Sequence, residues 1–344
     1  MRLSSSRSTA ILHRPQQDFL LWDKAGTRPS LDQQFADRKD LIDAISGQQL
    51  ITHTRASAGT YRGSDGLIKT ATTNEARFDH DPVTGESLGL LVEELRSNLL
   101  LNSGTLATQD VTVTAVAHTL SFYGSGTVTL SGTHTATVVG TGAYPARTTL
   151  TFTPTAGTLT VTVSGAVEYA NLEIGSFATS YIPTTASSTA SRSADVVSIT
   201  GANFSSWIDL NDGTFFSDSE VIAPSVQTQA AWSLTGGTYL TSLRQPQSTG
   251  NQFRAQIGSV FTPAPGTGNL LSAGTTKACV AYSGTAGRLQ VGSSSNDVTS
   301  AGVLDATDLY IGSFAGGTPL NGTIRRLTYW DQRLPNDTLE TITQ

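Results

Sequence analysis

The run Leu159-Thr160-Val161-Thr162-Val163 alternates apolar residues with threonine and decides the predicted fold of this chain. The same period of two recurs at Val111-Thr112-Val113, Thr127-Val128-Thr129-Leu130 and Thr149-Leu150-Thr151-Phe152. Successive side chains of a β-strand point to opposite faces, so each run has a buried apolar face and a threonine face toward water. Turn residues separate the runs at intervals typical of an antiparallel sandwich, which is therefore predicted for residues 103–185.

The composition of the whole chain fits a β protein with few charges. Of its 344 residues only 14% are charged, against about 25% in an ordinary soluble domain. The net charge of −6 and the absence of clustered lysine and arginine argue against a nucleic-acid partner. The one cysteine, Cys279, excludes an intramolecular disulfide and a cysteine-rich zinc site, and no cofactor is expected.

The sequence also bears on where the protein works. No stretch reaches the roughly 18 apolar residues that a membrane-spanning helix needs, so membrane insertion is not expected. The start, Met1-Arg2-Leu3-Ser4, lacks the apolar segment of a signal peptide. We expect synthesis in the cytoplasm, and any exit from the cell within an assembled particle.

Residues 1–102 are predicted to form an extended anchoring and assembly arm that carries one short helix. The helix is expected over residues 31–46, where four apolar residues share one helical face: Leu31, Phe35, Ile42 and Ile45.

A second feature of the arm is the apolar cluster Phe19, Leu20, Leu21 and Trp22. It is too small to form a core, and it would promote aggregation if it were exposed. Either the cluster docks on a partner or neighbouring subunit as an assembly contact, or it folds back onto its own domain. The sequence favours neither.

A second sandwich is predicted at the C-terminal end. Small polar residues without an apolar period mark a linker at residues 186–194. Residues 195–344 resume strand patterns, and a short closing helix is expected after Pro335. The predicted strands include Val196–Thr200, Gly213–Ile222, Gln252–Ile257, Lys277–Tyr282 and Thr323–Trp330. The predicted fold is thus mainly β, with two antiparallel sandwiches of the jelly-roll type behind an N-terminal arm.

Three stretches resemble known proteins. The stretch Phe78–Pro82 followed by Gly89–Leu99 closely resembles a segment common in structural proteins of tailed phages. In that family the segment precedes a sandwich like a carbohydrate-binding module, whose closing strand is similar to Tyr169–Gly175 followed by Thr179–Thr184. The C-terminal Gly322–Leu334 resembles the last strand of concanavalin-A-like, laminin-G-type sandwiches.

The resemblance implies a virion structural protein that assembles as an oligomer with other virion proteins and contacts the host surface. It supplies no catalytic motif, and a shared fold does not by itself establish glycan binding.

Aromatic residues are the candidates for binding sugar rings, whose C–H faces stack on flat side chains. Five of them lie in the second predicted sandwich: Trp232, Tyr239, Tyr282, Tyr310 and Trp330. Each of these side chains can equally serve the core, since aromatic residues are usually buried to a large extent.

Other chemistry finds less support. Asp218 and Glu220 share a strand face and could act as a hydrolase pair, although a solvated face explains them as well. The Asp209–Gly213 stretch has ligand types suited to calcium without the spacing of an EF-hand loop. No two histidines lie four residues apart, so no metal site is assigned.

Three hypotheses follow. The first is a non-enzymatic virion protein, a head decoration or tail fibre, that contacts host-surface polysaccharide; a homotrimer is the first guess for its assembly. The second is a pure cement protein without a ligand. The third is a polysaccharide-degrading enzyme.

Overall fold

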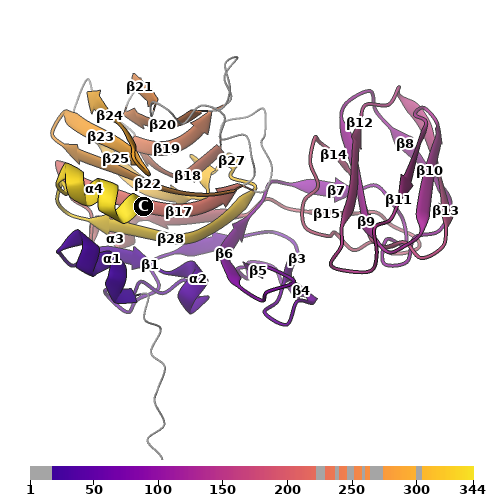
Figure 1. Cartoon of the computed structure of the whole chain (residues 1–344), viewed down its shortest axis with the longest axis horizontal. Helices are drawn as coiled ribbons and strands as arrows, with labels where there is room; N and C mark the ends of the chain where they lie inside the picture. Colours follow the sequence, from indigo (N-terminus) through magenta and orange to yellow (C-terminus); the bar gives the residue numbers. More distant parts are fainter. Residues whose placement is uncertain are drawn as a thin grey trace, which may run out of the picture.

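The computed structural model describes residues 18–221, 229–236, 240–245, 252–257, 260–263, 274–299 and 304–344. Antiparallel strands dominate them, with a few short helices, which confirms the predicted fold class. Two β-sandwiches of unequal size lie side by side along the long axis of the molecule (Figure 1). No helix in the described part of the chain combines the length and apolarity needed to cross a bilayer.

The larger sandwich consists of two facing sheets. One sheet has eight strands: β24 (Ser294–Thr299), β23 (Ala286–Val291), β22 (Gly274–Ser283), β17 (Asp212–Val221), β28 (Gly322–Trp330), β6 (Ser87–Val92) and β5 (Phe78–His80) in this order, with β1 (Leu31–Gln33) also paired to β28. The other has seven strands in the order β2 (Thr52–Thr54), β16 (Val196–Thr200), β25 (Ala306–Ile311), β18 (Gln229–Gly236), β19 (Leu240–Gln245), β20 (Gln252–Ile257) and β21 (Val260–Pro263).

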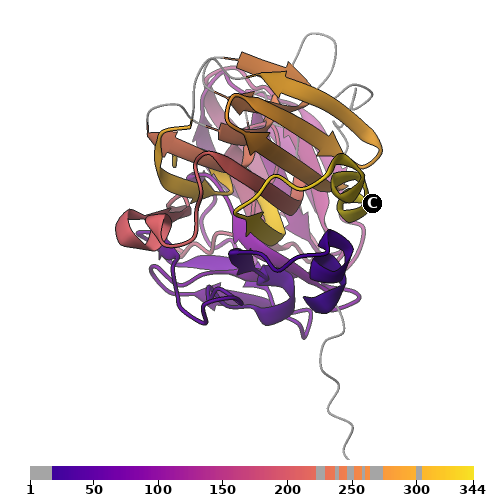
Figure 2. The same cartoon turned by 90° about the vertical axis from the view of Figure 1, so that its left-hand side faces the viewer.

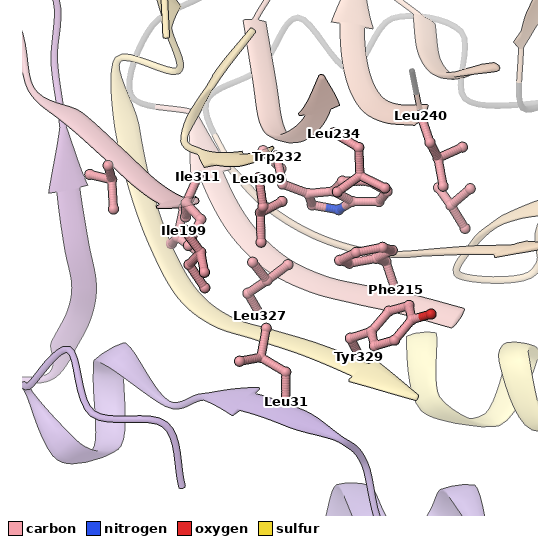
Figure 3. Packing of buried hydrophobic residues seen from close by; sticks show 14 of the residues in the cluster. Leu31, Ile199, Phe215, Trp232, Leu234, Leu240, Leu309, Ile311, Leu327 and Tyr329 are labelled. Carbon is pink, nitrogen blue, oxygen red and sulfur yellow. The ribbon is translucent and has the colours of Figure 1, made fainter. Parts of the chain in front are cut away.

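Apolar side chains from both sheets fill the space between them (Figure 3). Phe215 of β17 stacks on Trp232 of β18 across the gap, with ring centroids 4.1 Å apart. Tyr329 packs against Phe215 at 4.6 Å, and Leu31 enters the same core from β1. These four side chains are fully buried, so they contribute strongly to folding.

The smaller sandwich packs a four-stranded sheet on a three-stranded one. The first has the order β11 (Ala136–Val139), β10 (Thr127–Gly132), β13 (Gly157–Ser164) and β8 (Gln109–Val113), and the second β12 (Thr148–Phe152), β9 (His118–Tyr123) and β14 (Glu168–Ile174). Leu130 pairs with Val161 and both are fully buried, whereas Thr129 and Thr162 point outward. The alternation of the sequence therefore sets the two faces as predicted.

The smaller sandwich is an insertion into the larger one. The chain builds β1, β2, β5 and β6 of the larger sandwich before it enters the smaller one and returns for β16 to β28. Four strands within residues 31–92 thus belong to the larger sandwich, and this region does not stand apart as an arm. Figure 2 shows them as an indigo-to-purple layer against the orange and yellow strands.

Two short strand pairs lie at or near the junction. β7 (Arg96–Asn98) pairs with β15 (Ala190–Arg192), so part of the predicted linker is an ordered strand of a two-stranded neck. The hairpin of β3 (Gly59–Arg62) and β4 (Ile68–Ala71) lies between the sandwiches (Figure 1). The remaining elements are α3 (Gly201–Ser205), β26 (Ser313–Phe314) and β27 (Thr318–Pro319).

The helix predicted over residues 31–46 is wrong. Leu31 pairs with Tyr329 as part of β1, and only Phe35–Arg38 forms a helix, α2. The buried Asp32 accepts hydrogen bonds from Arg326 at 2.9 and 2.6 Å and from Thr328 at 2.7 Å. This long-range pairing to β28 overrides a local helical pattern that is only a weak preference.

The apolar cluster near the N-terminus folds back on its own chain. It forms helix α1 (Asp18–Ala25), which packs with the C-terminal helix α4 (Asn336–Thr343) against the outer face of the eight-stranded sheet. Leu21 is buried there beside Trp330, and Trp22 donates a 3.0 Å hydrogen bond to Asp32. The side chains of Phe19 and Leu20 lie outside the described residues.

Candidate functional site: a cleft between the sandwiches

Most of the aromatic residues predicted to stack on sugars are buried. Trp232 and Trp330 are 0% exposed and Tyr282 is 1% exposed. Their stacking role fails for a physical reason, since none has a ring face open to a ligand. Tyr310 is half-buried, and Tyr239 lies outside the described residues.

The structure instead forms a cleft of about 460 Å³ where the two sandwiches meet. One wall comes from the β3–β4 hairpin together with β5 and β6, and includes Tyr61, Arg62 and Asp79. The opposite wall is the outer face of the three-stranded sheet, with Thr149 and Thr151. Residues 176–181, which follow β14, line the cleft between the walls.

Aromatic rings gather at this cleft. The ring of Tyr123 lies 5.0 Å from that of Tyr144 and 6.2 Å from that of Tyr169, which in turn lies 5.4 Å from Tyr181. Phe177 also lines the cleft, and the guanidinium of Arg96 lies 4.7 Å from its ring centroid. Sites for small ligands commonly combine aromatic walls with a few polar groups in this way.

A bidentate ion pair holds the hairpin wall in place. Arg62 donates to Oδ2 of Asp79 from Nε at 3.1 Å and from Nη2 at 2.5 Å. The backbone N–H of Arg62 also donates to Oδ1 of Asp79 at 2.6 Å. Two charged hydrogen bonds to Oδ2 and the backbone bond to Oδ1 fix both side chains, so this carboxylate is held by its partner and is not free in the cleft.

Glu93 lines the cleft as part of a buried network. It forms ion pairs with Arg77 at 2.7 Å and Arg192 at 3.2 Å, and accepts hydrogen bonds from the N–H and hydroxyl of Ser180, both at 2.7 Å. Burial raises the pKa of Glu93, but the two arginines and Ser180 outweigh burial and lower it to about 2. Its carboxyl is therefore ionised at neutral pH and cannot act as a general acid.

Asp195 extends the network toward the larger sandwich. It accepts from Arg55 at 3.0 Å, from Arg77 at 2.5 Å and from the backbone N–H of Glu93 at 2.9 Å, and His53 lies 3.3 Å away. Burial opposes ionisation, yet Arg77 and the other partners hold the pKa of Asp195 well below its usual range. Because Ser180 belongs to the segment that follows the smaller sandwich, the network fixes this segment, which lies between the walls, against the wall formed by β5 and β6.

Arg147 contributes a second guanidinium to the cleft. It lies just before β12, and its Nη2 donates a 2.7 Å hydrogen bond to the hydroxyl of Ser121. Its guanidinium carbon lies 5.9 Å from the ring centroid of Tyr123. The neighbouring Pro145 and Thr149 line the same wall.

The geometry gives no hydrolase pair. Asp79 and Glu93 line the cleft, and both are held by arginines. A glycosidase needs one carboxyl that keeps its proton near neutral pH and a second that is ionised. The other predicted pair lies elsewhere, on β17, where Asp218 lines a separate groove with Lys277 and Arg326.

Metal-ligand groups also take structural roles. Within the described ranges, no group of three or more histidine, cysteine, aspartate or glutamate side chains could hold a metal ion. In the stretch that suggested calcium, Oδ1 of Asp209 accepts the backbone N–H of Asn211 at 2.8 Å. This is the hydrogen bond of a turn that leads into a strand.

Three comparisons with known proteins were made, and only the one with solved structures found similar proteins. No family model and no curated protein matches this chain. Its structure has similarity to the CBM40 module of Ruminococcus gnavus IT-sialidase bound to α2,6 sialyllactose, at 12% identity and a TM-score of 0.32, over 39% of this chain and 84% of the module. It is also similar to domain 4 of the GH43 arabinanase AbnA from Geobacillus stearothermophilus in complex with arabinotriose, at 11% identity and a TM-score of 0.34, over 44% of this chain and 73% of that domain.

A third solved structure is the heptameric SAP-like pentraxin from Limulus polyphemus, at 14% identity and a TM-score of 0.30, over 39% of this chain and 70% of the pentraxin chain.

The sequence did not reveal the cleft. Thr149 and Thr151 have the pattern of an ordinary solvated strand face, and Tyr123 and Tyr181 are separated by 58 residues. The one usable signal was the concentration of tyrosines between residues 123 and 181, a region otherwise rich in threonine and valine.

Proposed function

We propose that this protein binds carbohydrate without cleaving it, and that the cleft between the sandwiches is the binding site. One observation carries the proposal: rings and hydrogen-bonding side chains share the walls of one cavity. Tyr181 and Phe177 offer apolar surface for sugar C–H groups, and Thr149 and Arg62 offer hydrogen-bonding groups for sugar hydroxyls. Its volume of about 460 Å³ falls within the usual range of roughly 300–1,000 Å³ for small-ligand sites.

The absence of catalysis is part of the proposal. Both carboxylates that line the cleft are paired with arginine, and the pKa of Glu93 is lowered to about 2. Neither fits the role of a proton donor to a glycosidic oxygen. The full-length protein should therefore bind oligosaccharides and leave them intact.

We also propose, on the resemblance of Phe78–Leu99 and Tyr169–Thr184 to phage structural proteins, a place for the protein in a tailed-phage virion. There it would assemble with other virion proteins as a homo-oligomer, a trimer in our first guess, and meet host-surface polysaccharide. Many copies would raise the avidity of a weak single site. The protein should then co-sediment with purified phage particles, and its absence from them would refute this part.

The cleft itself is tested by calorimetric titration of the full-length protein against a panel of oligosaccharides. Phe177→Ala should weaken binding about tenfold because a stacked ring is lost. Tyr310→Ala is the matched control, since Tyr310 is a half-buried aromatic residue of the larger sandwich that does not line the cleft. Loss of binding with Tyr310→Ala and not with Phe177→Ala would move the site to the larger sandwich, and no binding across the panel would refute the proposal.

A further inference from the structure

Two arginines and two carboxylates line the cleft, but they are not all paired with one another. Arg62 is neutralised by Asp79, and Glu93 is neutralised by Arg77 and Arg192. Arg147 lines the same cavity, yet it forms no ion pair with any carboxylate among the residues that the structure describes. One positive charge of the cleft wall is thus left without a direct counter-ion.

The position of this charge is fixed. Nη2 of Arg147 is held by the hydroxyl of Ser121 at 2.7 Å, and the side chain lies beside the ring of Tyr123. Its Nε is buried, has no hydrogen-bond partner among the described residues, and is therefore not open to a ligand. The ligand must therefore be met by the terminal nitrogens of the guanidinium, which present several N–H donors in one plane to the oxygens of a carboxylate or a sulfate.

The carboxyl that Arg147 influences most directly does not replace such a ligand. Glu173 is fully buried beneath the cleft wall and accepts hydrogen bonds from the hydroxyl and the N–H of Thr179. Burial raises the pKa of Glu173, against the opposing charges of Arg147 and Arg192. Glu173 is therefore a weaker counter-charge than a surface carboxylate would be.

We infer that the ligand of the cleft is an acidic oligosaccharide, whose anionic group binds the guanidinium of Arg147 while its hydroxyls meet Thr149 and the hairpin wall. This inference rests on the proposed function and adds the chemical class of the ligand. A charge held in a cavity is less screened by water than one on an open surface. The attraction should therefore select acidic chains over neutral chains of the same length.

The test is calorimetric titration of the full-length protein with paired probes that differ only in charge. The acidic probes are oligogalacturonate, oligoalginate, oligosialate and a sulfated galactan hexasaccharide; their neutral partners are the methyl esters and the desulfated galactan. We expect at least one acidic probe to bind about tenfold or more tightly than its neutral partner. Arg147→Gln should lower the affinity for that acidic probe by about 10- to 100-fold, as expected for a charged hydrogen bond, and change the neutral partner little.

Two further variants make the result decisive. Arg147→Lys keeps the charge without the planar fork and should retain part of the preference for acidic probes. It tests the inference even if Arg147→Gln does not fold. Arg288→Gln removes an equal charge from an ion pair on the larger sandwich and should leave binding unchanged. The acidic probe whose affinity falls in Arg147→Gln shows whether the ligand carries a carboxylate or a sulfate.

Two outcomes separate this inference from the proposed function. Equal binding of acidic and neutral partners, or an acid preference that survives Arg147→Gln, overturns the acidic ligand and leaves the carbohydrate cleft in place. Failure of every probe, charged or neutral, overturns both.

Discussion

The larger sandwich and the cleft use aromatic side chains in opposite ways. In the larger sandwich, Trp232, Tyr282 and Trp330 are at most 1% exposed; the first two pack between the sheets, and Trp330 packs under helices α1 and α4. At the cleft, Tyr123 and Tyr181 line the cavity and form one ring cluster with Tyr144 and Tyr169, which do not line it; Tyr169 is 36% exposed. The comparison teaches that a count of aromatic residues points to the core of this protein, whereas their exposure points to its surface site.

The largest effect should come from the core. Trp232→Ala removes the ring that stacks on Phe215 and leaves a cavity between the sheets, which should lower the free energy of unfolding by about 3–5 kcal/mol. Urea denaturation followed by circular dichroism measures this loss. If Trp232→Ala instead kept full stability and lost only carbohydrate binding, the division between core rings and cleft rings would be wrong.

The next effect concerns the network around Glu93, which fixes residues 176–181 against one wall of the cleft. The pKa of Glu93 is lowered to about 2 by its partners, whereas an unfolded glutamate has a pKa of about 4.3. A lowered pKa stabilises the folded protein above the unfolded pKa, and this stability is lost as the pH falls toward 2. Glu93→Gln should therefore cost about 3 kcal/mol at pH 7 and much less near pH 2.

Denaturation at pH 7 and at pH 3 gives the difference in unfolding free energy between the wild-type protein and the Glu93→Gln variant. We expect this difference to be smaller at pH 3. Glu86→Gln is the control, because Glu86 pairs with Arg325 at an exposed position and should change stability by less than about 1 kcal/mol. A difference at Glu93 that stayed constant with pH would show that its ionisation does not stabilise the fold.

The smallest effect is the loss of stability when a single tyrosine hydroxyl is removed, and it should differ between Tyr282 and Tyr144. The hydroxyl of Tyr282 donates to the carbonyl of Asp209 at 2.5 Å and bonds to the hydroxyl of Tyr329 at 2.9 Å. The hydroxyl of Tyr144 is buried and has no partner in the part of the chain that the structure describes, and burial raises its pKa to about 12. Tyr282→Phe should cost about 1 kcal/mol, whereas Tyr144→Phe should be neutral or slightly stabilising. Thermal melting of both variants measures these stability changes. A loss of stability in Tyr144→Phe would mean that the Tyr144 hydroxyl has a hydrogen-bond partner in solution.

Strand positions could be predicted well because they depend on local alternation. The predicted strands Val196–Thr200 and Gln252–Ile257 coincide with β16 and β20, and the closing helix appears as α4. The helix over residues 31–46 failed because Asp32 pairs with Arg326, 294 residues away. No local pattern records such a partner, and the same holds for the pairing of β6 with β28.

The candidate site was beyond sequence prediction for the same reason. Its walls come from residues 60–93, 119–151 and 176–181, which meet only because the smaller sandwich is inserted between β6 and β16. The ion pairs that close this junction join Arg77 to Glu93 and Asp195, the second of them 118 residues away.

The sequence by itself determined that this is a β protein, and it located many of the strands and the apolar side of each. It could do so because apolar and polar residues alternate between neighbouring positions. The tertiary structure alone decided which aromatic rings are buried, which arginine keeps an unpaired charge and where a ligand could bind. Those properties depend on distances between residues far apart in the chain, and only packing sets them.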